Sequence, residues 1–295
     1  MTKLIDRLIA RWQESLIGRV LQRFNDSHGA VLASGMSFSA VFSVFAALWI
    51  GIGVFGFLLT GNPELWDTIM ALLNSWIPGL IDLGNGGAID PGTLRPSISA
   101  LSWTGAIALL ALLFTALGWL EATRSSLYAV MGLPESKRNV VVVKVTDIGL
   151  MLGFGIIILL TGVSAIAAGS AASWLSDLTH FGEQHEMFST GVIQIAGFSV
   201  NFVFNIVVLL MLFRVLARVK LRVREYWLQL LCGAIALTIM QALGSILLGG
   251  ASRNPLLATF AILVGLLLWF NLVSRLILLI AAWIAVSHEP ELEMD

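Results

Sequence analysis

The sequence predicts an all-α, polytopic membrane protein with six transmembrane helices. Of its 295 residues, 58% are hydrophobic and only 12% are charged, and the mean hydropathy is +0.91. Soluble domains usually contain about 25% charged residues. Several apolar stretches reach the length of about 20 residues that a helix needs to cross a hydrocarbon core about 30 Å thick. These observations exclude an ordinary soluble enzyme, a disordered chain and a secreted disulfide scaffold.

The six predicted spans are defined by their length and continuous apolar character. They cover residues 31–59, 98–119, 148–168, 193–213, 227–248 and 256–286. Transmembrane strands would instead be about 9–11 residues long with alternating polarity. A basic segment of about 30 residues precedes the first span, so we expect no cleavable signal peptide. The predicted organisation is a cytoplasmic helix over 1–28, a six-helix domain over 29–286 and an acidic cytoplasmic tail over 287–295.

The lead-in segment 1–28 predicts an amphipathic helix lying at the membrane surface. Apolar side chains recur every four positions from Leu4 to Phe24. The remaining face carries the basic residues Lys3, Arg7, Arg11, Arg19 and Arg23. A helix of this kind lies in the membrane interface and is attracted to anionic lipid headgroups. It either orients the first span or docks a partner.

The distribution of basic residues predicts the orientation of the spans. Besides the lead-in helix, they occupy the loop after the second span (Arg124, Lys137, Arg138, Lys144) and the loop after the fourth (Arg214, Arg218, Lys220, Arg222, Arg224). The opposite loops contain only Arg95 and Arg253, together with several acidic residues. Because basic residues near span ends face the cytoplasm, both termini are predicted to be cytoplasmic.

Arg275 is the most suggestive polar residue, because a charge at membrane depth costs free energy. It lies in the sixth span, and Asn271 precedes it by one helical turn on the same face. One interpretation is that Arg275 contacts an anion or a lipid headgroup inside the bundle. The other is that it pairs structurally with a carboxylate such as Glu121 or Asp147.

Four further residues are candidates for a substrate path. Glu121 and Asp147 lie at the cytoplasmic ends of spans. Glu121 either forms a local pair with Arg124 or takes part in proton coupling. Asn201 and Asn205 share one face of the fourth span, where interhelical hydrogen bonding is the default role and a polar path the alternative.

Small residues at helical spacing, such as Ser164, Ala168 and Ala172, predict close helix packing and are compatible with self-association.

The sequence gives little support for catalysis or for a cofactor. The histidines and acidic residues near His180 lack the HExxH spacing of a metal site, and the lone cysteine, Cys232, excludes multi-cysteine sites. Phosphate-loop, nucleophile-elbow and dinucleotide motifs are absent. The basic residues are explained by topology, so no nucleic-acid partner is expected. We therefore expect a non-enzyme without metal or cofactor, and any transport to be passive or driven by an ion gradient.

The chain resembles the YihY/BrkB family of bacterial inner-membrane proteins along essentially its whole length. The resemblance rests on the basic lead-in helix and, in order, on ASGMSFSAVFSVFAALWIGIG, GWLEATRSSLYAVMGLP and NPLLATFAILVGLLLWFNLVSRLILLIAAW. The first span departs from the usual family form at Phe38 and Phe42, and it lacks a proline after Ser43. The resemblance implies a six-helix protein of the bacterial plasma membrane, in a family regarded as transporters and once mislabelled as ribonuclease BN.

Three hypotheses for function follow. The first is a transporter or lipid flippase of the cell envelope, with membrane lipids as partners and the candidate polar residues lining its interior. The second is a non-transporting scaffold that organises the envelope through its basic lead-in helix. The third and most remote is a membrane-embedded enzyme, which would need acid–base or metal-binding groups brought together by the fold.

Overall fold

The computed structural model describes residues 14–59, 103–134, 141–157, 186–219, 221–248 and 255–288. It also describes residues 67, 70, 71, 73, 74, 81, 82, 139 and 160. The long elements in this part of the chain are helices, as the sequence predicts: α2 (Leu16–Asp26), α3 (Gly29–Leu59), α5 (Trp103–Met131), α7 (Glu186–Leu210), α8 (Trp227–Leu248) and α9 (Pro255–Ser287). Residues 141–157 form a further helix.

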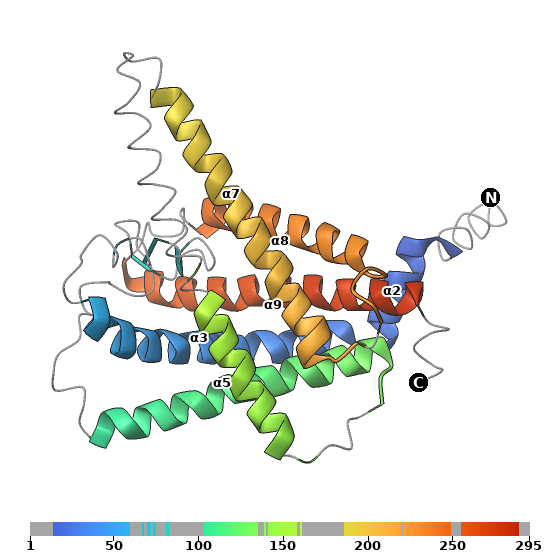
Figure 1. The fold of residues 1–295 in the computed structure, drawn as a ribbon, viewed down its shortest axis with the longest axis horizontal. Helices are drawn as coiled ribbons and strands as arrows, with labels where there is room; N and C mark the ends of the chain where they lie inside the picture. Colours follow the sequence, from blue (N-terminus) through green and yellow to red (C-terminus); the bar gives the residue numbers. More distant parts are fainter. Residues whose placement is uncertain are drawn as a thin grey trace.

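Among the described helices, α2, α3, α5 and α8 pack against α9 (Figure 1). The α3 helix lies against both α5 and α9, while α8 packs on α9 and α7 packs on α8. In the figure α3 and α9 run side by side in opposite directions, and α7 crosses the bundle obliquely. The core is apolar and includes Met36, Leu127, Leu212, Leu230 and Leu278, each no more than 1% exposed.

Three predicted spans coincide closely with helices of the structure, and two others are extended. The first span begins two residues after α3 begins and ends at the same residue. The fifth span matches α8, and the sixth differs from α9 by one residue at each end. The prediction that the second span ends at residue 119 is wrong as a helix boundary, because α5 continues to Met131. The α7 helix likewise continues into a π-helix, η4 (Met211–Leu216). The part of the third span beyond residue 160 lies outside the described residues.

The lead-in segment is not one continuous amphipathic helix. The α2 helix begins at Leu16, because Ser15 has extended backbone angles and its side chain accepts a hydrogen bond from the Gly18 N–H at 3.1 Å. This is an N-cap, and it interrupts the helical pattern. The α2 helix then meets α3 at a bend of 66°. A Cβ atom at Gly29 would overlap the Phe24 ring, so glycine allows this close turn.

The end of α5 is held by a glycine cap and by Arg23. Gly132 has a positive φ of 68°, and the Leu133 N–H donates to the Tyr128 carbonyl at 3.0 Å. This is the Schellman arrangement, in which glycine is strongly favoured. The Arg23 Nε donates to the Val130 carbonyl at 2.9 Å. These bonds satisfy carbonyl groups that a helix end leaves without partners.

We expect Gly132→Ala to lower the free energy of unfolding by about 1–3 kcal/mol, because it forces a non-glycine residue into the left-handed region. Its Cβ would also overlap the Arg23 guanidinium. Denaturant unfolding in detergent measures the effect, with Gly118→Ala on the open face of α5 as the control. Equal stabilities of the two variants would contradict the prediction.

Candidate functional site

A network of uncharged polar side chains joins α7 to α8. The Asn205 Nδ2 donates to Thr238 Oγ1 and to Gln241 Oε1, both at 3.0 Å. The Asn201 Nδ2 donates to the same Gln241 oxygen at 2.9 Å, and Gln241 Nε2 returns a bond to Asn205 Oδ1 at 3.3 Å. Thr238 donates its own hydroxyl proton to the Ala234 carbonyl at 2.8 Å. The sequence-predicted pair Asn201 and Asn205 is therefore brought together with two residues of the next helix. We call these four side chains the amide network.

The amide network is partly buried and lies within stretches that can span a membrane. Asn205 is only 3% exposed. The stretches Gly197–Leu216 and Trp227–Gly244, which contain all four side chains, are long and apolar enough to cross a membrane. One atom stands out: Asn201 Oδ1 is buried and has no hydrogen-bond partner among the described residues. A buried acceptor without a partner costs about 1–3 kcal/mol, so this oxygen is positioned to accept a bond from something else.

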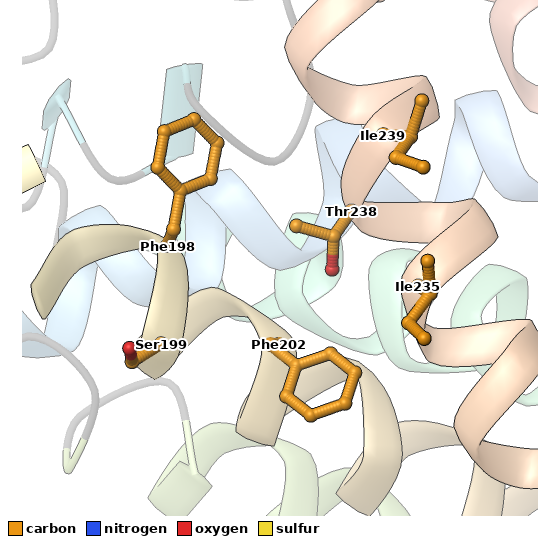
Figure 2. A pocket seen from close by; sticks show the side chains of 6 residues that line it. All are labelled: Phe198, Ser199, Phe202, Ile235, Thr238 and Ile239. Atoms are coloured by element: carbon orange, nitrogen blue, oxygen red, sulfur yellow. The ribbon is translucent and has the colours of Figure 1, made fainter. Parts of the chain in front are cut away.

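A groove of about 340 Å³ opens beside the amide network (Figure 2). Its walls come from α7 and α8 and consist of Phe198, Ser199, Phe202, Ile235, Thr238 and Ile239. Thr238 belongs both to the groove and to the amide network, so the polar cluster borders an apolar depression. Phe198 and Ile239 are 54% and 55% exposed, as expected for a surface that faces lipid.

The two carboxylate candidates form separate ion pairs between α5 and the helix at 141–157. Asp147 is 0% exposed and pairs with Arg124, which is 13% exposed. Glu121 pairs with Lys144 at 2.8 Å, and both of these side chains are exposed. The hydrogen bond and the charge of Lys144 lower the pKa of Glu121, which lies beyond the predicted span. Neither carboxylate forms its ion pair with Arg275. Glu121 pairs with Lys144 and not with Arg124, although the charge of Arg124 also lowers the pKa of Glu121.

One interpretation of the sequence placed Arg275 inside the bundle, but its side chain does not point there. Its side chain is exposed on the outer face of α9. Leu268 and Leu272 on the same face are 62% and 51% exposed. Asn271 is half-buried and donates through Nδ2 to Ser34 Oγ on α3 at 3.2 Å. The reason is packing: Ser274, Ile277 and Leu278 occupy the buried face of α9, which turns Arg275 outward.

The basic residues predicted for the membrane surface have different environments. Arg19 is exposed, as expected of a surface residue. Arg23 instead donates a hydrogen bond to the end of α5 and so stabilises the packing of α2 against that helix end. Lys3, Arg7 and Arg11 lie outside the described residues.

Sequence reasoning missed the turn between the π-helix and α8. Arg214 Nη1 donates to the carbonyls of Val219 and Leu221 at 2.9 and 3.0 Å. Arg218 has a positive φ of 52° and donates to Thr146 Oγ1 at 3.2 Å. Tyr226 is fully buried beside this turn, and its burial raises the pKa of its hydroxyl. The sequence analysis used Arg214 and Arg218 only to predict the orientation of the spans. In the structure their hydrogen bonds stabilise this turn.

Gln241 and Thr238 were also missed, although a signal for them existed. They lie three residues apart in the fifth span, which is otherwise strongly apolar. The same rule that selected the two asparagines, a polar residue at membrane depth, applies to them. Among the described residues, no group of His, Cys, Asp and Glu side chains is arranged to hold a metal ion.

These features identify the chain as a helical membrane protein. Three described helices are long and apolar enough to span a membrane, and the bent pair α2–α3 is a fourth if the two helices together form one span. The family model described as virulence factor BrkB matches residues 20–294. The chain belongs to this BrkB family, and the resemblance seen in the sequence is confirmed.

Two relatives with curated descriptions are similar along most of their length. The inner membrane protein YhjD of Escherichia coli (strain K12) is 22% identical over 277 residues, covering 92% of this chain and 80% of the relative. An uncharacterised protein of Dickeya dadantii (strain 3937) is 23% identical over 286 residues, covering 94% of this chain and 84% of the relative. No solved structure matches the chain.

Proposed function

We propose that this chain is a multi-pass bacterial inner-membrane transporter or lipid flippase of the cell envelope, with six spans and both termini in the cytoplasm. The amide network is the observation that carries the proposal. Its four neutral side chains lie within stretches that can span a membrane, and one of them, Thr238, lines a groove on the lipid-facing surface. Polar groups at such depth are expensive and are functional candidates by default. The relative named as an inner membrane protein supports the location.

The chemistry of the side chains in the amide network indicates the kind of molecule that is transported. Asparagine, glutamine and threonine exchange hydrogen bonds readily and carry no charge, so they suit an uncharged or net-neutral polar group. The groove beside them is lined by two phenylalanines and two isoleucines, which suit an acyl chain. The chain performs no covalent chemistry in this proposal. Transport is passive or coupled to an ion gradient, because the sequence has no phosphate loop for ATP.

The test separates transport from structural hydrogen bonding. Asn201→Leu removes one hydrogen bond together with an acceptor that has no partner among the described residues. We expect its unfolding free energy to change by less than about 1 kcal/mol, while transport falls at least about tenfold. Transport is measured as movement of fluorescent phospholipid across proteoliposomes of phosphatidylethanolamine and phosphatidylglycerol. Asn25→Leu, an exposed asparagine of α2, is the matched control.

Three outcomes are informative. Loss of transport at unchanged stability supports the proposal. Unchanged transport would show that the network only joins α7 to α8. Absence of phospholipid movement with the unaltered protein would overturn the flippase proposal and favour the scaffold, whose function should depend on the lead-in helix.

A further inference from the structure

The outer surface between α3 and α9 has polar side chains near the start of α3 and two exposed phenylalanines further along α3. Ser34, Phe38 and Phe42 follow one another at four-residue spacing on α3, and all three are exposed. Asn271 faces this row from α9, and Arg275 lies one turn further along the same helix and is exposed. We call these five residues the α3–α9 seam. Asn271 ties its two sides together by donating to Ser34 Oγ at 3.2 Å.

The Asn271–Ser34 bond fixes the depth of Arg275 in the bundle. Because α3 and α9 run in opposite directions (Figure 1), one turn along α9 from Asn271 to Arg275 corresponds to one turn back along α3, from Ser34 to Ala30. Ala30 lies in the first turn of α3, directly after the 66° bend with α2. Arg275 therefore lies near the level at which α2 meets the bundle, which the distribution of basic residues places at the cytoplasmic leaflet.

Arg275 needs an anionic partner. Its side chain is exposed among apolar neighbours, and no ion pair or hydrogen bond engages it within the described residues. A cation facing lipid is costly unless it reaches headgroups or pairs with a negative charge. A guanidinium binds phosphate through two parallel hydrogen bonds. The described carboxylates that form ion pairs are engaged with Arg124 and Lys144.

The remainder of the α3–α9 seam matches the rest of a phospholipid. Moving away from α2, the polar pair Ser34 and Asn271 lies about where the ester groups would follow a phosphate held at Arg275. Phe38 and Phe42 come next, 60% and 51% exposed, with ring centroids 4.9 Å apart. They offer an apolar surface to acyl chains. The order of charge, hydrogen-bonding groups and aromatic rings follows the order of groups in a lipid of the cytoplasmic leaflet.

We propose that the α3–α9 seam binds a phospholipid with a net negative headgroup, its phosphate on Arg275. A net negative headgroup is favoured because the seam offers a cation and no carboxylate that would bind an ammonium group. The bound lipid is distinct from anything carried past the amide network on α7 and α8. The proposal therefore holds whether or not the chain transports.

Native mass spectrometry of the full-length protein tests the proposal. The protein is presented with equal amounts of phosphatidylglycerol and phosphatidylcholine that carry the same acyl chains. We expect at least one tightly retained lipid, with phosphatidylglycerol favoured about tenfold. Arg275→Gln should remove that preference. Arg222→Gln removes the same charge from an exposed turn outside the seam and should leave the preference intact.

A chain that retains both lipids equally would overturn the proposal without any variant. So would equal loss of phosphatidylglycerol in the two glutamine variants, because the interaction would then be a general charge effect. Conversion of a dimer to a monomer by Arg275→Gln, with lipid retained, would show instead that a second copy of the chain covers the seam. If Arg275→Gln does not fold, Asn271→Leu keeps the net charge and should weaken retention severalfold; unchanged retention would count against the seam.

Discussion

Replacing Asp147 with alanine is expected to lower the free energy of unfolding by about 3–5 kcal/mol. Asp147 is 0% exposed, and Arg124, its partner on α5, is only 13% exposed. Removing one member of a buried pair leaves the other charge without compensation in a poorly solvated site. Because the pair joins α5 to the helix at 141–157, we expect that helix to detach first. Denaturant unfolding in detergent, followed by tryptophan fluorescence, measures the loss.

The neighbouring exposed pair provides a matched control. Lys144 and Glu121 join the same two helices, but their side chains are 39% and 65% exposed. Lys144→Ala should therefore cost no more than about 1 kcal/mol. The double variant Arg124→Met with Asp147→Leu should recover most of the stability, since apolar residues often replace a buried pair without loss. If Asp147→Ala costs no more than Lys144→Ala, the buried pair does not hold these helices together.

Gly244→Val is expected to cost about 3 kcal/mol or more, at the upper end of the usual range for overpacking. Gly244 lies on α8 where it meets α9, and a Cβ atom there would overlap the ring of Trp269. Trp269 is only 5% exposed, so the ring has little room to move. The two helices would have to separate, which would widen the contact on which the bundle depends. Thermal unfolding in detergent and protease sensitivity of the α8–α9 region report this change.

Two other glycines make this prediction specific. Gly118→Val on α5 should be close to neutral, because no atom lies within 4 Å of the added Cβ. Gly233→Ala should fall between the two, since its closest neighbour is the flexible end of Ile280. Equal effects at Gly244 and Gly118 would mean that α8 and α9 do not approach as closely as described.

Much of the architecture followed from the sequence because its signals are local. The length and apolarity of residues 227–248 and 256–286 predicted α8 and α9 within a residue at each end. Helix ends that depend on capping were less well predicted. Ser15 starts a new helix within an otherwise continuous amphipathic pattern. Gly132 ends α5 twelve residues beyond the predicted span, because the helix continues past the apolar stretch.

The class of protein, the family and the identity of the polar residues in the apolar stretches could all be predicted from the amino-acid sequence. The partners of these residues become visible in the folded chain alone: Gln241 and Thr238 for the asparagines, Arg124 for Asp147, and Ser34 for Asn271. The tertiary structure also decided that Arg275 faces outward. The physical reason is that lipid is as apolar as the bundle interior. A spanning helix therefore lacks the polar face that marks the exposed side of a soluble helix, and only packing against its neighbours fixes the direction of each polar side chain.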